Sequence, residues 1–122
     1  LHDQHLHGAP ASYSMIGAEC EVQPGLVFEL IQPLEGDSIY KEHLDRYGEG
    51  VQHIAMMQHS QGESDDFKAR FQAAGFPMTM GGRIGETIEF YYLDTMPAVH
   101  FVTEGGSGHA IDLKPVRQYP PA

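Results

Sequence analysis

Three ionisable residues stand in otherwise apolar runs of this sequence. Glu29 lies in VFELI, His53 lies in VQHIA, and Glu104 ends the run HFVTE. An ionised carboxylate inside a core strand is costly unless it is paired or binds a cation. Carboxylate oxygens and an imidazole nitrogen together suit Zn, Fe, Mn, Co or Ni. The three residues therefore predict a divalent metal site, provided that their strands converge on one point.

A structural interpretation stays open for each of these residues taken alone. In that interpretation Glu29 faces solvent across the pleat of its strand. His53 is then a hydrogen-bonded core histidine, and Glu104 simply ends a strand. The prediction of a metal site depends on the three residues as a set.

The elements around Glu29 form a predicted β-hairpin. Residues 12–22 and 26–31 are expected to be strands, because both contain apolar stretches and the turn sequence Gln23-Pro24-Gly25 separates them. Proline fixes φ at this turn, and glycine supplies a positive φ. Residues 1–11 are polar and contain Gly and Pro, so we expect an irregular arm ahead of the hairpin.

A short helix follows the hairpin. Asp37 or Ser38 can cap it, and Tyr40, Leu44 and Tyr47 form an apolar face at helical spacing. This helix links the hairpin to the second half of the chain.

The second half has the order strand, helix, strand, strand, strand. Residues 51–58 (VQHIAMMQ) form the first strand, and a helix begins at Ser64, buries Phe67 and Phe71, and ends at Gly75. The remaining expected elements are a short strand near Met78, a glycine-rich turn at Gly81, Gly82 and Gly85, strands at 87–93 and 99–104, and a short extra strand at 109–113. The pattern from residue 51 is one complete βαβββ unit. The hairpin and linking helix match the back half of a second such unit.

The chain resembles the vicinal oxygen chelate superfamily, which includes glyoxalase I, methylmalonyl-CoA epimerase and the extradiol dioxygenases. The resemblance covers residues 12–105 and rests on FELIQPLEGDSIYKEHLDRYGEGVQHIAM and GRIGETIEFYYLDTMPAVHFVTE, with GEGVQHIA as its most specific part. It implies an α+β fold of paired βαβββ modules (the glyoxalase/bleomycin-resistance/dioxygenase fold) in a cupped mixed sheet around one divalent metal ion. The first module is incomplete here.

The resemblance also assigns roles to residues. Glu29, His53 and Glu104 match three metal-ligand positions of the superfamily, and Glu104 is the expected catalytic residue. Asp112 replaces Glu104 if the extra strand is the true terminal one. The fourth ligand of the superfamily has no counterpart in this sequence, because the first strand and helix of module one would precede Leu1.

Three explanations for that missing quarter stay open. The chain is a fragment of a longer protein, a second chain supplies the strand, or His5 or His7 reaches the metal from the N-terminal arm. The first is preferred, because a half-built module leaves a sheet edge and a sheet face uncovered.

The expected function is a metal-dependent lyase or isomerase of the glyoxalase type. It would act on a small carbonyl or thioester substrate through a metal-stabilised enolate. One alternative is an Fe(II)-dependent dioxygenase of the same superfamily. The others are a metal-free protein that sequesters small molecules and a structural or interaction domain.

Composition limits the classes of partner. The 122 residues include 7 Lys+Arg and 17 Asp+Glu, for a net charge of −10, so no basic surface is available for nucleic acid. No apolar run is long enough to span a bilayer, and one cysteine suits a reducing compartment. We expect a cytoplasmic homodimer whose single domain, 1–122, comprises a first half-module with its linking helix (12–48), a complete module (49–105) and a tail (106–122).

Overall fold

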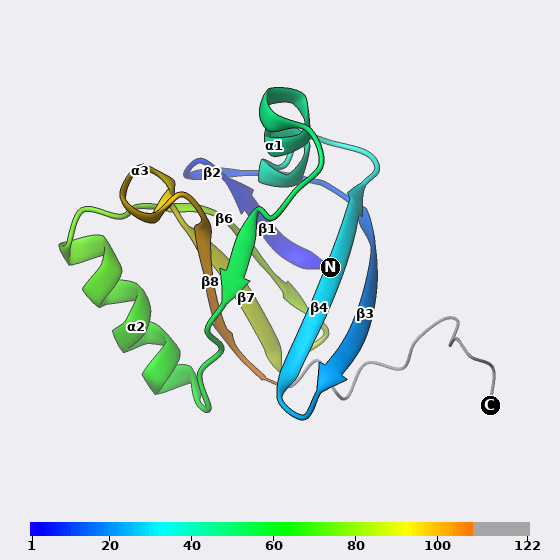
Figure 1. The fold of residues 1–122 in the computed structure, drawn as a ribbon. Coiled ribbons are helices and arrows are strands. Elements are labelled where there is room, and N and C mark those ends of the chain that lie inside the picture. The colour runs from blue at the N-terminus through cyan, green and yellow to red at the C-terminus, as the bar shows by residue number, and fades with distance from the viewer. Residues whose placement is uncertain (109–122) are drawn as a thin grey trace.

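The computed structural model of the protein describes residues 1–108 and has a mixed α+β fold in which most strands are antiparallel (Figure 1). Its elements in chain order are β1 His2–Leu6, β2 Ala9–Pro10, β3 Met15–Gln23, β4 Leu26–Pro33, α1 Ile39–Tyr47, β5 His53–Ala55, α2 Gln61–Ala73, β6 Met78–Ile84, β7 Ile88–Leu93, α3 Met96–Val99 and β8 Val102–Ser107. The α+β class predicted from the sequence is therefore confirmed. None of the described helices has the length and apolar character needed to cross a membrane.

Six strands form the main sheet, in the order β2-β1-β6-β7-β8-β5. All neighbouring pairs are antiparallel except β5 and β8, which run parallel with Ala55 opposite Glu104. A parallel pair requires a long crossover connection, and here the chain passes through α2, β6 and β7 between the two strands. The result places the strand of His53 directly beside the strand of Glu104.

The strands β3 and β4 form a separate two-stranded sheet that faces the main sheet (Figure 1). They pair as the predicted hairpin, with Glu19 opposite Glu29 and Cys20 opposite Phe28. Because side chains alternate across a strand, Glu19 and Glu29 share one face of the hairpin. Glu29 contacts His53 of the main sheet, so this acidic face is the inner one.

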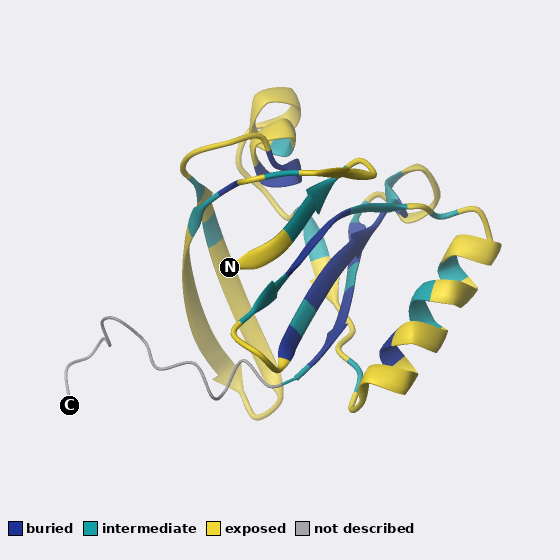
Figure 2. Ribbon diagram, turned by 180° about the vertical axis from the view of Figure 1, so that it is seen from behind, coloured by how far each residue is buried: buried dark blue, intermediate teal, exposed yellow. Residues whose placement is uncertain are grey.

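The opposite face of the hairpin is apolar and exposed. The register places Ile16, Ala18 and Cys20 on it, across from Gln32, Leu30 and Phe28. Leu30 is 72% exposed and Phe28 is 60% exposed. Figure 2 shows the hairpin as exposed along most of its length, whereas the buried residues gather in the main sheet. The hairpin therefore contacts the rest of the fold mainly at its base, where Met15 and Ile31 pack against the core, and through the face that carries Glu19 and Glu29.

The core lies between α1, the base of the hairpin and the face of the main sheet that looks toward the hairpin, here called the inner face. Its buried members are Tyr13, Ile39, Tyr40, Met80, Phe90, Tyr92 and Val102. The other face of the sheet, here called the outer face, is covered by α2. There the hydroxyl of Tyr91 on β7 donates to the backbone oxygen of Ser64 at 2.8 Å.

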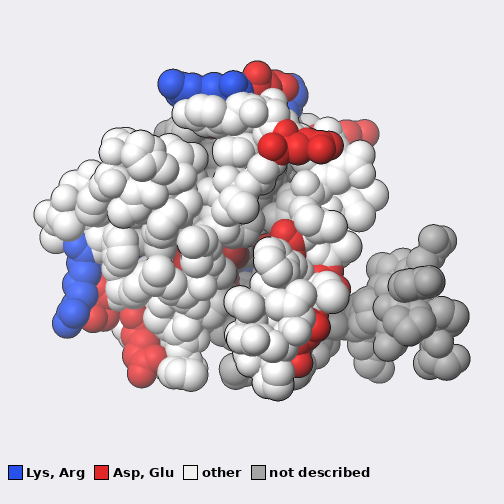
Figure 3. Space-filling model, in the orientation of Figure 1, with Lys and Arg blue, Asp and Glu red and all other residues white. Residues whose placement is uncertain are grey.

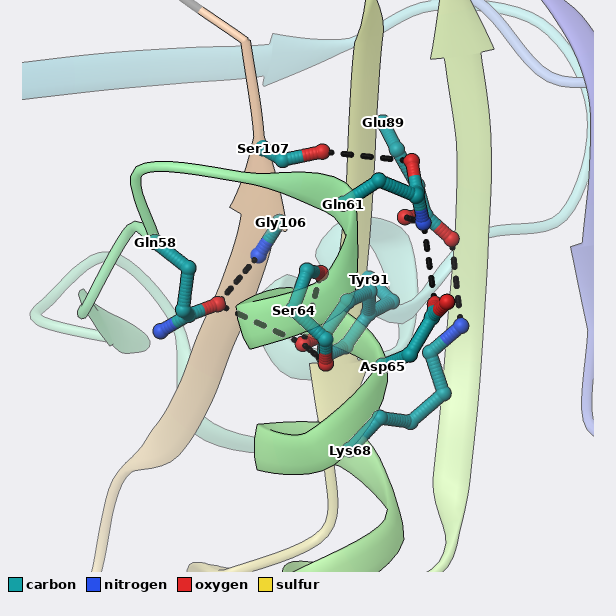
Figure 4. Close-up of polar contacts among 9 residues, drawn as sticks. All are labelled: Gln58, Gln61, Ser64, Asp65, Lys68, Glu89, Tyr91, Gly106 and Ser107. Atoms are coloured by element: carbon teal, nitrogen blue, oxygen red, sulfur yellow. Dashed lines mark hydrogen bonds and ion pairs between the residues drawn. The ribbon is translucent and has the colours of Figure 1, made fainter.

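Figure 4 shows how polar groups fasten α2 to the outer face. The Gln58 side chain, in the segment that leads into α2, accepts a hydrogen bond from the Gly106 amide at 3.1 Å. Within α2, Lys68 pairs with Glu89 at 3.1 Å. Lys68 also lies over the ring of Tyr91, 4.6 Å from its centroid. These contacts lie across the sheet from Glu104, so they fix α2 and take no part in the inner face.

The N-terminal arm predicted at residues 1–11 is wrong. Residues His2–Leu6 form β1, which pairs with β6, and Ala9–Pro10 forms the edge strand β2. The predicted glycine-rich turn is also wrong in part, because Gly81 and Gly82 lie inside β6 and only Gly85 lies in the turn. A side chain at Gly81 would bring its Cβ within 2.8 Å of the His5 ring, so the strand pairing requires glycine there.

Other boundaries shift by a few residues. The helix α1 is capped by Ser38 as predicted, but only its first turn is buried, since Tyr47 is 55% exposed. The helix α2 begins after Ser60 and not at Ser64, which is fully buried inside it. The strand predicted at residues 51–58 is shorter than expected, because β5 covers only His53–Ala55. The one-turn helix α3, which was not predicted, precedes β8. The extra strand predicted at 109–113 lies outside the described residues.

Candidate metal centre

The three side chains singled out by the sequence meet at one point between the two sheets. Nε2 of His53 lies 3.2 Å from Oε2 of Glu29 and 3.4 Å from Oε2 of Glu104. One ligand atom from each residue lies within 4.8 Å of the others. With metal–ligand bonds of about 2.1 Å, adjacent ligands of a tetrahedral or octahedral ion are roughly 3.0–3.4 Å apart. The separations and the mixed O/N donor set therefore fit a first-row divalent ion.

The two sheets deliver these ligands separately. Glu29 points from β4 toward the main sheet, and its side chain is 36% exposed. His53 on β5 and Glu104 on β8 come from neighbouring parallel strands, and their side chains are only 11% and 12% exposed. The site is thus half-enclosed, with its open side at the hairpin.

A glutamine orients the imidazole. Nδ1 of His53 lies 3.0 Å from Oε1 of Gln52, and Nε2 of the same amide donates to the backbone oxygen of Ile39 at 3.0 Å. Because that amide nitrogen must donate to a carbonyl, its oxygen is the acceptor for Nδ1–H. This arrangement directs Nε2 at the two carboxylates, which is how second-layer groups orient metal-binding histidines.

The electrostatics of the centre favour shared protons or a cation. Burial opposes protonation of His53, but the hydrogen bond to Glu29 and the charge of Glu104 outweigh it and raise the pKa of His53. Burial raises the pKa of Glu104 to about 7, with a further rise from Glu29 and an opposing effect of His53. In a metal-free protein these groups hold protons that a divalent ion would displace.

Further negative charge surrounds the centre. Glu19 lies opposite Glu29 in the hairpin, and its charge adds to the rise in the pKa of Glu104. Like charges directly opposite each other on adjacent strands are destabilising unless a cation relieves them. Across residues 1–108, no ion pair joins a lysine or arginine to Glu29 or Glu104. In Figure 3 the basic side chains lie over the two helices α1 and α2, at the margins of the view.

The alternative ligands proposed from the sequence do not join this cluster. The Nε2 atom of His7 lies 2.8 Å from a carboxylate oxygen of Glu42, and the ring of His5 lies against Gly81 near Lys68 and Glu89. Asp112 lies outside the described residues. Gln52 was not predicted, although its position next to His53 is a signal that could have indicated it.

No protein-family model matches the chain, and no curated protein sequence matches it.

Proposed function

We propose that the protein binds one divalent metal ion through Glu29, His53 and Glu104 and acts as a lyase or isomerase of the glyoxalase type. The observation that carries this proposal is the convergence of three ligand atoms within 4.8 Å from strands of two sheets. The proposed substrate is a small carbonyl or thioester compound that reaches the centre from its open side.

The order of elements supports the same assignment. From β5 onward the chain forms a strand, the helix α2 and three further strands, and the first and last of these strands are parallel neighbours. The hairpin β3–β4 precedes this unit and carries Glu29 on its second strand. We therefore propose one complete βαβββ module and the back half of another, as in the vicinal oxygen chelate superfamily.

The proposed chemistry is proton transfer next to a carbonyl group. A divalent ion held by Glu29, His53 and Glu104 would supply Lewis acidity for the negative charge on the carbonyl oxygen. Glu104 is the proposed proton acceptor, because its carboxylate is nearly buried and stands at the centre itself, 3.4 Å from His53 Nε2. Glu29, His53 and Glu104 would hold the ion, and Gln52 keeps the imidazole in the required orientation.

An Fe(II)-dependent dioxygenase is the second candidate. The donor set of the described residues contains two carboxylates and one imidazole, whereas the common Fe(II) oxygenase triad contains two imidazoles and one carboxylate. Because of this difference, we rank the lyase or isomerase above the dioxygenase as the proposed function.

Metal content and proton exchange test the proposal. The purified chain is stripped with a chelator and reloaded with Zn, Ni, Co, Mn or Fe(II), and bound metal is counted per chain. Proton exchange at the carbon next to the carbonyl is then followed by NMR in D₂O with small ketones, 2-oxoaldehydes and acyl thioesters. We expect one ion per chain, at least about 100-fold weaker binding in His53→Ala and Glu29→Gln, and no exchange in Glu104→Gln.

Two variants provide matched controls. His59 and Glu86 are exposed and lie outside the centre, so His59→Ala and Glu86→Gln should bind metal and exchange protons like the wild type. Full metal retention by His53→Ala would show that the ligand assignment is wrong. Metal binding without exchange, accompanied by substrate-dependent O₂ uptake with Fe(II), would favour the dioxygenase.

A further inference from the structure

Negative charge on the inner face of the hairpin borders the open side of the candidate metal centre. Glu19 lies directly opposite Glu29, and Glu21 follows two residues later in β3. Because side chains alternate across a strand, Glu21 lies on the same face as Glu19, about 7 Å further toward the turn of the hairpin. Both residues are exposed. Their carboxylates therefore line the side from which a substrate would reach the centre.

The strands that form the centre contain no lysine or arginine. None occurs in β3, β4, β5 or β8, which carry the three ligands together with Glu19 and Glu21. Within residues 1–108, neither Glu19 nor Glu21 forms an ion pair. The charge of these two carboxylates is therefore not balanced by a basic side chain of the described chain.

The basic side chains of residues 1–108 lie on other elements. They are Lys41 and Arg46 of α1, Lys68 and Arg70 of α2, and Arg83 of β6. Three of those on the helices already pair with acids, and Arg83 lines a cavity on the outer face of the main sheet. Figure 3 shows the basic side chains of the helices at the margins of the surface, away from the acidic groups of the hairpin. None of the five belongs to an element that carries a ligand.

Metal binding would not remove this imbalance of charge. The carboxylates of Glu29 and Glu104 match the two positive charges of a divalent ion, and a histidine that binds a metal is neutral. Glu19 and Glu21 then remain as two negative charges at the open side. An anionic group that approaches the centre meets them in a half-enclosed space, where repulsion is stronger than in bulk water.

We infer that Glu19 and Glu21 select the substrate by charge, so that uncharged or cationic carbonyl compounds and thioesters reach the centre and anionic ones do not. This inference rests on the proposed function and narrows its substrate class. Keto acids and thioesters on phosphorylated carriers are disfavoured, because proteins bind carboxylate and phosphate groups through arginine and lysine. The strands around the centre supply neither residue.

Three methyl ketones of similar size test this selection. Pyruvate is an anion, hydroxyacetone is uncharged and aminoacetone is a cation. Exchange of their methyl protons for deuterium is followed by NMR with the metal-loaded full chain, and the kcat/KM values are compared. We expect hydroxyacetone and aminoacetone to exceed pyruvate by at least about 10-fold at low salt. The difference should shrink in about 1 M NaCl, because the screening length falls to about 3 Å.

Two double variants separate the local charge of the hairpin from the net charge of the chain. Glu19→Gln/Glu21→Gln removes both carboxylates from the inner face, whereas Asp66→Asn/Glu86→Gln removes the same charge from exposed positions outside the centre. We expect the hairpin variant to raise kcat/KM for pyruvate about 10-fold relative to hydroxyacetone, and the control variant to keep the wild-type ratio. The Co²⁺ affinity of both variants is measured in parallel, so that a change in metal binding is recognised as such.

Charged nitroxides measure the same electrostatic potential without turnover. Cationic aminomethyl-PROXYL or anionic carboxy-PROXYL is added to the metal-free chain and to the Zn²⁺-loaded chain, and the paramagnetic relaxation of each amide proton is recorded. We expect the cation to relax the amide protons of β3 and β4 at least about twofold more strongly than the anion. In Glu19→Gln/Glu21→Gln this difference should become clearly smaller.

Each outcome decides a separate point. Pyruvate exchange equal to that of hydroxyacetone, or equal relaxation of the hairpin amides by both nitroxides, would overturn the selection by charge while leaving the proposed function standing. A preference that persists unchanged at high salt, or in Glu19→Gln/Glu21→Gln, would assign the selection to shape and would also overturn the inference. A wild-type chain that exchanges none of the three ketones with any of the metals would overturn the proposed function and this inference with it.

Discussion

Glu29 and His53 stand 24 residues apart, on strands of two separate sheets, and their side chains meet at 3.2 Å. Because the two strands belong to different sheets, no local strand pairing brings these two side chains together. The contact depends on α1, which turns the chain from the hairpin to β5 and packs its first turn into the core. The centre is therefore a product of the tertiary fold, and its integrity can be tested by perturbing either sheet.

Metal binding should stabilise the folded chain. A ligand present at about 100 times its dissociation constant adds roughly 2.7 kcal/mol to the free energy of unfolding. For a chain of this size, that corresponds to a rise in melting temperature on the order of 10 °C. Thermal melts with and without Zn²⁺ should show this rise in the wild type and in Glu86→Gln, and EDTA should reverse it. A Glu29→Gln protein that melts with the same Zn²⁺-dependent rise would contradict the role of the hairpin ligand.

The metal-free protein should become less stable as the pH rises toward neutrality. The folded-state pKa of Glu104 is about 7, against 4.5 for an unperturbed carboxyl group. Between these values the folded state holds a proton that the unfolded state releases, so the free energy of unfolding falls by up to about 3 kcal/mol. The raised pKa of His53 acts in the same direction, since its contribution is full below about pH 6.5 and is lost as the pH rises through the folded-state pKa.

Urea unfolding of metal-free protein from pH 4.5 to pH 8 measures this effect. In Glu104→Gln the carboxyl contribution is absent, so the fall with pH should be clearly smaller than in the wild type. The comparison cancels the groups that both proteins share. Parallel pH profiles for the two proteins would show that the Glu104 pKa is not raised in the folded state.

Replacing Gln52 should weaken metal binding without removing a ligand. Gln52→Leu deletes the acceptor for His53 Nδ1–H and frees the imidazole to rotate, so we expect about 10-fold weaker binding. Co²⁺ titration measures the affinity. Gln32→Leu, on the exposed face of the hairpin, is the control and should bind like the wild type. Equal affinity in Gln52→Leu and the wild type would show that the imidazole is oriented by other contacts.

Two glycines should respond to substitution in opposite directions. At Gly106 in β8 a Cβ would lie 2.1 Å from the backbone oxygen of Glu89, and φ is +151°, so Gly106→Ala should cost on the order of 3 kcal/mol. At Gly62 in α2 the nearest atom would be 4.0 Å away, so Gly62→Ala should stabilise the chain by about 0.5–1 kcal/mol. Urea denaturation of both variants checks this. If Gly106→Ala had the same free energy of unfolding as the wild type, β7 and β8 would separate more easily than their pairing indicates.

The sequence predicted the three members of the centre because ionised groups in apolar strands require a partner. It could also predict the hairpin, whose turn residues act locally through proline and glycine. The strand β1 could not be predicted in the same way, because its sequence HDQHL has no apolar alternation and it forms only by pairing with β6. Whether such a polar segment becomes a strand depends on its pairing partner in the tertiary fold and not on its local propensity.

The predicted start of α2 at Ser64 was wrong for a different reason. Ser60 and Glu63 have the spacing of a capping box, and the Ser60 side chain accepts a hydrogen bond from the Glu63 amide at 3.1 Å. The acidic pair after Ser64 gave a competing signal for the helix start. Ser64 is instead buried against Tyr91, a contact between distant segments that no local pattern contains.

The exposed hairpin has a consequence for how an ion would enter and leave. β3 and β4 form a sheet of their own, and isolated two-stranded hairpins are marginally stable in water. If the centre binds its ion as proposed, the ion joins this loosely held hairpin to the main sheet through Glu29, much as a removable cross-link would. Opening of the hairpin and release of the ion then become one coupled event. Hydrogen exchange of the hairpin amides should therefore report metal occupancy directly, and slow exchange there would mark the loaded state.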